Sequence, residues 1–156
     1  MKTVFISIIL LSAVTVHVNA QDEISLRKNN FNLEKGLAIQ GYDPVAYFTQ
    51  NKAIKGKEEL SVTYQGVIYN FSSVDNKQAF AKDPSAYEPQ YGGWCAYAMG
   101  KKGEKVEVDP GTFKIINSKL YLFYNKYFNN TLKSWNKDEA NLKVQADANW
   151  QKFYHS

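Results

Sequence analysis

Alternating hydrophobic and polar residues at one place in the chain, and paired apolar runs at another, predict two β-hairpins. From Leu60 to Tyr64 every second residue is apolar, and a largely apolar run from Val67 to Phe71 follows directly after Gln65-Gly66. An alternation of period two is typical of a strand, and a short glycine-containing link is typical of a hairpin turn. Two further apolar runs, 113–116 and 120–124, predict the second hairpin.

Helices are predicted from capping residues and from helical spacing. Ser72 or Ser73 is well placed to cap a helix over 74–82. Two more helices are expected towards the C-terminus, over 126–136 and 138–153, and in the second of these apolar residues recur near helical spacing. The chain is therefore expected to have an α+β fold, in which a small antiparallel sheet built from the two hairpins packs with short helices and a helical C-terminus.

The first twenty residues have the pattern of a signal peptide. Lys2 precedes an apolar run over 4–16, and small residues lead to Ala20, after which cleavage is expected. The apolar run is shorter than the roughly 20 residues that a membrane-spanning helix needs. We therefore expect an exported protein, periplasmic or secreted, with no membrane span after cleavage. Residues 21–36 are polar and are expected to form a flexible N-terminal arm, which leaves 37–156 as one folded domain.

Charge and histidine content narrow the classes of function. The 19 basic and 15 acidic residues are interspersed and leave a net charge of +4, which is not the clustered basic surface of a nucleic-acid-binding protein. Of the two histidines, one falls in the signal peptide and the other, His155, is next to last. Histidine-based catalysis is therefore not expected. An enzyme that uses Cys95 stays open, although its thiol would need a basic partner, and only lysines, Arg27 and His155 are available for that role.

A glycine-bracketed stretch, Gly92–Gly100, contains the only cysteine in the chain. Cys95 and Met99 are four residues apart, so in a helix both sulfur atoms would lie on one face. Thiolate and thioether sulfur are soft ligands that suit a transition metal such as copper, and Asp43 is a candidate third ligand. The alternatives are that the two sulfur residues pack in the core and that Asp43 caps a short helix.

Aromatic residues lie beside glycine in two stretches, Gly41–Phe48 and Trp94–Met99. Such residues can line a ligand pocket, or they can simply be part of a buried aromatic core. Glycine permits close approach of two backbone segments, so we expect the two stretches to meet, although about fifty residues separate them. The residues expected to converge are Tyr42, Asp43, Tyr47, Trp94, Cys95 and Tyr97.

Three short motifs, in this order and at this spacing, resemble the YHS domain family. They are Asp43-Pro44-Val45, the strand end from Tyr69 to Ser73, and the segment from Phe80 to Tyr87 with its Asp-Pro pair. The stretch Gly92–Ala96 and the second hairpin resemble an exported, single-domain branch of that family. With these included, the resemblance covers most of the chain after the signal peptide.

The resemblance implies a fold and a class of function. YHS domains are associated with metal-handling proteins, and their cysteines are regarded as the ligands. Here Ala46, Ser72 and Asn76 stand at those cysteine positions, so the family's thiolate site does not carry over. We therefore expect an exported binding protein for a transition metal ion or a small ligand at the two glycine-marked stretches. The alternative is a non-catalytic structural or protein-interaction module that has lost an ancestral metal site.

Overall fold

The computed structural model describes residues 20–154, so the expected signal peptide, apart from Ala20, lies outside the described residues. The expected α+β fold is confirmed, with a long helix at the C-terminal end. The elements in chain order are α1 (Ala20–Asn30), β1 (Leu33–Glu34), β2 (Leu37–Ala38), η1 (Ile39–Gly41), α2 (Ala46–Thr49), β3 (Lys57–Tyr64), β4 (Val67–Phe71), α3 (Val74–Lys82), α4 (Pro84–Tyr87), η2 (Gln90–Gly93), α5 (Ala96–Lys102), β5 (Asp109–Ile116), β6 (Lys119–Phe123), β7 (Asn125–Lys126), β8 (Asn129–Asn130), α6 (Thr131–Trp135) and α7 (Glu139–Tyr154).

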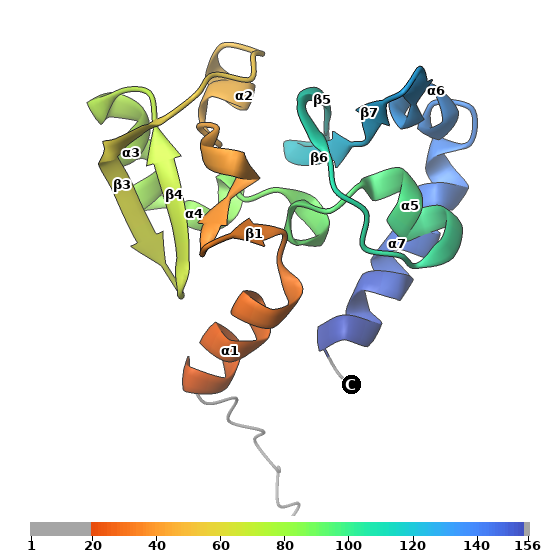
Figure 1. Cartoon of the computed structure of the whole chain (residues 1–156), viewed down its shortest axis with the longest axis horizontal. Coiled ribbons are helices and arrows are strands. Elements are labelled where there is room, and N and C mark those ends of the chain that lie inside the picture. Colours follow the sequence, from red (N-terminus) through yellow and green to blue (C-terminus); the bar gives the residue numbers. More distant parts are fainter. Residues whose placement is uncertain (1–19, 155–156) are drawn as a thin grey trace, which may run out of the picture.

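Both predicted hairpins are present, as β3–β4 and β5–β6, but they belong to separate sheets. The first sheet has the order β1-β2-β4-β3, and it is mixed because β2 pairs with β4 in parallel, through Leu37 and Ile68. Figure 1 shows the β3–β4 hairpin with α3 on one side of the molecule and α5, α6 and α7 on the other. The expectation of one antiparallel sheet built from the two hairpins is thereby corrected, because the hairpins lie in separate sheets and β2 pairs with β4 in parallel.

The predicted helix 74–82 forms as α3, because Ser73 caps it through a hydrogen bond from the Asn76 N–H to the Ser73 hydroxyl at 3.1 Å. The long C-terminal helix also forms, as α7. The expected helix over 126–136 is wrong in its first half. Tyr127 and Phe128 have φ values of 51° and 64°, which turn the chain between β7 and β8, and the Asn130 side chain then caps α6.

The polar segment that we expected to be a flexible arm begins instead with helix α1. Asp22 and Glu23 lie in its first turn and Arg27 and Lys28 in its last, an arrangement that complements the helix dipole. The helix has almost no apolar face, which is why the hydrophobic pattern did not predict it. Arg27 attaches it to the domain, since this residue is only 5% exposed.

Buried residues form two clusters. The first includes Tyr69, Phe71 and Phe80, where the mixed sheet meets α3, and it continues to Cys95 and to the β6 residues Leu120 and Leu122. The second is formed by α5, β6, α6 and α7 around Tyr121 and Trp135. None of the helices within residues 20–154 is both long and apolar enough to cross a membrane.

Candidate functional site

Asp43 is completely buried, and both of its carboxylate oxygens are hydrogen-bonded. Oδ1 accepts the backbone N–H groups of Val45 at 2.9 Å and Ala46 at 3.3 Å, so Asp43 stabilises the start of α2. Oδ2 accepts the backbone N–H and the hydroxyl of Ser72, at 2.8 and 2.6 Å, and the Asn76 amide at 2.7 Å. Positions 46, 72 and 76 therefore meet around the Asp43 carboxylate, which cross-links α2, β4 and α3.

The two tyrosines of the first glycine-marked stretch have different environments. Tyr47 is buried, packs edge-on against Phe113, and donates its hydroxyl proton to the Pro110 carbonyl at 2.9 Å. Burial, more than the charge of nearby groups, raises its pKa far above the usual value. Tyr42 is half-buried, and the Lys55 ammonium lies 4.8 Å from the centre of its ring.

Residues of the second stretch are divided between the two core clusters. Cys95 is fully buried in the first cluster, whereas Met99 belongs to the second, which also contains Trp135. The Cys95 sulfur accepts the Tyr124 N–H at 3.4 Å and lies 3.4 Å from the Thr131 hydroxyl. The indole N–H of Trp94 donates to the carbonyl of Asn30 at 2.6 Å and so joins this stretch to α1.

The six residues that we expected to converge are only partly brought together. Tyr47 and Cys95 share the first core cluster, and Tyr42 and Tyr97 pack against it. Trp94 packs against the second cluster, and all the hydrogen-bond donors around Asp43 come from residues 45–76. The two stretches therefore share part of a core.

The candidate metal ligands do not fit a metal ion. The Asp43 oxygens are already occupied by five donors, and the sulfur atoms of Cys95 and Met99 belong to different clusters. Within residues 20–154, no three His, Cys, Asp or Glu side chains are grouped so that they could hold a metal. Two separated sulfur atoms are too few ligands for a closed soft-metal site.

A hollow of about 400 Å³ lies against Cys95, and we call it the Cys95 hollow. Cys95 and Thr131 form its inner end, where the Thr131 hydroxyl donates to the Tyr124 carbonyl at 2.9 Å. Tyr97 from the predicted stretch lines it, together with Ala98 of the same helix. The hollow is therefore built mainly by α5 and by the segment that connects β6 to α6.

The rest of the lining gives the hollow an apolar wall and a charged mouth. Val106 and the Tyr124 ring add to the apolar surface. Lys101 and Lys102 are exposed and lie on the last turn of α5, and Glu104 follows them. The sequence indicated Cys95 and Tyr97. It did not indicate Tyr124, which was expected only as the end of a strand, or Thr131, because residues 126–136 were expected to be one helix.

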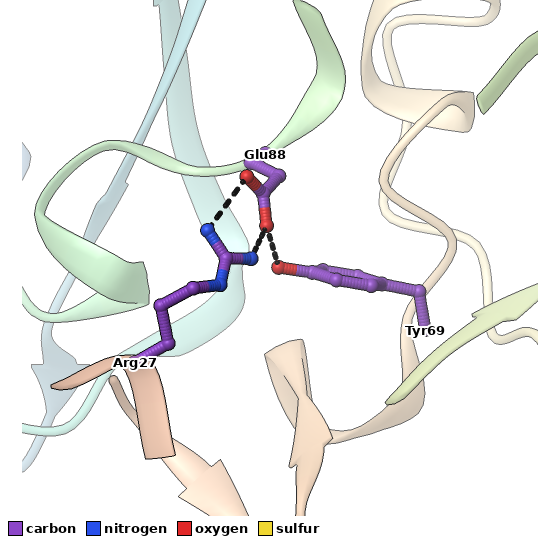
Figure 2. A network of polar contacts seen from close by, with 3 residues as sticks. All are labelled: Arg27, Tyr69 and Glu88. Carbon is purple, nitrogen blue, oxygen red and sulfur yellow. Dashed lines mark hydrogen bonds and ion pairs between the residues drawn. The ribbon is translucent and has the colours of Figure 1, made fainter. Parts of the chain in front are cut away.

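A second polar cluster, which the sequence did not predict, connects α1 to the sheet (Figure 2). Both terminal nitrogens of Arg27 contact the Glu88 carboxylate, and the Tyr69 hydroxyl donates to the same carboxylate. Burial, followed by the charge of Glu88, raises the pKa of Tyr69 well above its usual value. Arg27 also lies over the Phe31 ring, 4.5 Å from its centre. All three polar side chains have partners, so we regard the cluster as structural.

Comparison of the chain with protein-family models, with curated proteins and with solved structures gave no match. The likeness to YHS domains therefore rests on the sequence motifs alone.

Proposed function

We propose that this chain is an exported binding protein of YHS type that holds a small apolar molecule with an acidic group in the Cys95 hollow. One observation carries the proposal: one of the two glycine-marked stretches expected to carry the site lines a hollow that is apolar inside and has two lysines and Glu104 at its mouth, where Lys102 lies 4.0 Å from Glu104. Apolar walls with a few placed polar groups are typical of small-ligand sites. The two lysines at the mouth, Lys101 and Lys102, suit an anionic group on the ligand.

The surroundings of the thiol favour binding over catalysis. A nucleophilic cysteine needs a base or a cation that stabilises its thiolate. The groups that contact the Cys95 sulfur are the Tyr124 N–H and the Thr131 hydroxyl, and neither is a general base. The thiol is thus suited to be part of the inner surface of a binding site.

An anionic fluorescent dye, anilinonaphthalene sulfonate, is a suitable probe for this site. We expect it to bind and brighten, and we expect the substitution Ala98→Leu, which fills the hollow, to abolish the signal. The double substitution Lys101→Gln, Lys102→Gln should weaken binding about tenfold, or about 1.4 kcal/mol. The control pair Lys57→Gln, Lys82→Gln removes two exposed lysines outside the hollow and should leave binding unchanged.

Two results would contradict this function. Dye binding that survives Ala98→Leu, in a protein whose circular dichroism is unchanged, would place the ligand elsewhere. Cu(I) binding tighter than ~10 μM that is lost in Cys95→Ser would favour the metal-ion hypothesis instead.

The alternative, an interaction module, is favoured by a different observation. Tyr127 and Phe128 form the tip of the β7–β8 hairpin, and they are 88% and 111% exposed. Exposed aromatic side chains are frequent anchors at protein interfaces. If the alternative is correct, replacing both with serine will abolish the capture of a partner from a periplasmic or culture-medium extract, and the dye experiment will be unaffected.

A further inference from the structure

A second hollow, of about 480 Å³, is lined by residues of β2, β3 and β4, beside a register shift in the β3–β4 pair. On one side β2 pairs with β4 only between Leu37 and Ile68. On the other side the register of β3 shifts, so that Ser61 pairs with Asn70 but Lys57 pairs with Phe71. The side chains of Ile68 and Asn70 alternate with the core residues of β4 and therefore point to the opposite face of the sheet. We call this space the Asn70 hollow.

Asn70 is the unusual residue of this hollow. Its side chain lines the space although the residue is only 5% exposed. Within residues 20–154, its amide group makes no hydrogen bond to the protein, and its polar atoms are not sealed from solvent. Most largely buried polar groups in proteins are paired within the protein, whereas the polar atoms of Asn70 reach only the solvent in the hollow. The group is therefore available to a molecule that enters the hollow.

Lys55 and the Asn70 amide face the same small volume, above Gly41. A Cβ atom placed on Gly41 would lie 3.3 Å from the Leu37 Cδ2, 3.5 Å from the Asn70 Nδ2 and 3.6 Å from the Lys55 Nζ. Because residue 41 has a φ of +79°, a side chain is strained there, so glycine leaves this volume to the three neighbouring groups and to a ligand atom. The Lys55 ammonium is held in place by the Gln40 carbonyl and the Tyr42 ring. An ammonium and an amide that converge in this way suit the two oxygens of a carboxylate.

The charged residues that line the hollow balance one another. They are two lysines, Lys35 and Lys55, and two glutamates, Glu34 and Glu58. A zwitterionic ligand, which carries one positive and one negative group, matches such a lining better than a simple anion does. Leu37 and Ile68 add an apolar surface that can accept an aliphatic side chain.

From these observations, we propose that the Asn70 hollow binds a free α-amino acid. The carboxylate lies between Asn70 and Lys55 above Gly41, and the ammonium lies toward Glu34 and Glu58. This site is separate from the Cys95 hollow, which is lined by other residues. The proposal therefore does not depend on the function proposed above.

The test is a titration of the isotope-labelled protein, followed by nuclear magnetic resonance. The probe is L-leucine, and the comparison probes are isocaproate, which lacks the ammonium, and isopentylamine, which lacks the carboxylate. We expect L-leucine to shift the Asn70 side-chain amide signals saturably and to bind at least about tenfold more tightly than either comparison probe.

Variants of exposed residues test the same site with little risk to folding. Lys55→Gln should weaken L-leucine binding about tenfold, whereas Lys57→Gln, on the neighbouring strand and outside the lining, should not. The double substitution Glu34→Gln, Glu58→Gln should also weaken L-leucine binding. Glu59→Gln, which changes a glutamate outside the lining, is the control. Ala98→Leu, which fills the other hollow, should have no effect.

Two outcomes would overturn the proposal. If the Asn70 amide signals do not move with L-leucine, the hollow is filled by solvent only. If isocaproate binds as tightly as L-leucine, the site recognises a simple carboxylate and the amino-acid assignment is wrong.

Discussion

Asp43 illustrates how a single residue can hold three elements together. Every group around its carboxylate is a donor: the Val45 and Ala46 N–H groups on one side, and Ser72 and Asn76 on the other. Hydrogen bonds to a charged group contribute about 1.5–3 kcal/mol each. Because all five donors converge on two oxygens, no neutral side chain of the same shape can satisfy them.

We therefore predict that Asp43→Asn lowers the free energy of unfolding by at least about 3 kcal/mol. The new amide nitrogen must face donors on whichever side it is placed. Chemical denaturation in urea measures the change, and Asp75→Asn, which alters an exposed residue of α3, should change stability by less than about 0.5 kcal/mol. Equal stability of the Asp43→Asn variant and the wild type would contradict the prediction.

Only half of the role of Asp43 could be predicted from the sequence. Its position before Pro44 and Val45 indicates a helix cap, and the bonds to Val45 and Ala46 agree with that. The bonds to Ser72 and Asn76 join positions about thirty residues apart, and they depend on where β4 ends. The same reason explains why Asn70 and Tyr124 were missed: no spacing rule relates them to their neighbours in space.

Among the elements, hairpins and capped helices were predictable because their signals are local. The turns of both hairpins contain two consecutive residues with positive φ, at Gln65-Gly66 and Asn117-Ser118, and this turn matches the twist of the strands. Helix α1 was not predictable in this way. Its polar contacts with the domain are made by Arg27 and Asn30, and in a polar segment a buried arginine or asparagine cannot be distinguished from an exposed one.

The attachment of α1 gives a second prediction. Arg27→Met should lower the free energy of unfolding by about 3 kcal/mol, because it leaves the Glu88 carboxylate, whose side chain is only 14% exposed, without its cation. Lys28→Met, on the exposed surface of the same helix, is the control. Adding Glu88→Gln to Arg27→Met should restore part of the loss, as expected for coupled residues. Urea unfolding measures all three variants, and equal stability of Arg27→Met and Lys28→Met would contradict the prediction.

The β7–β8 hairpin gives a prediction of increased stability. Phe128 has a φ of 64° and its side chain is fully exposed, so the folded protein bears the strain without gaining from burial. Phe128→Gly should therefore raise the free energy of unfolding by about 1 kcal/mol. Phe128→Ala keeps the strain and is the matched control. If alanine stabilises as much as glycine, the exposed ring and not the backbone is the unfavourable feature.

At the scale of the whole molecule, both clusters of the core contain buried tyrosines. Tyr47 and Tyr69 belong to the first cluster and Tyr91 to the second. Each hydroxyl donates to an acceptor: the Pro110 carbonyl, Glu88 and, at 2.8 Å, Asp147. Each of these hydrogen bonds requires that the tyrosine hydroxyl keeps its proton. Burial, as the first cause, raises the pKa of all three hydroxyl groups far above the usual value.

Alkaline pH should therefore unfold the protein steeply. In the unfolded chain, tyrosine loses its proton near pH 10, while the folded protein keeps three of them, so unfolding releases protons above this pH. The stabilising contribution is fully present below about pH 10, and it falls by about 1.4 kcal/mol per pH unit for each tyrosine, or roughly 4 kcal/mol for the three together. Urea unfolding measured at a series of alkaline pH values gives this slope. Tyr47→Phe should reduce the slope by about 1.4 kcal/mol per pH unit, whereas Tyr127→Phe, which changes an exposed side chain, should leave it unchanged. The same slope in Tyr47→Phe as in the wild type would show that this hydroxyl ionises in the folded protein.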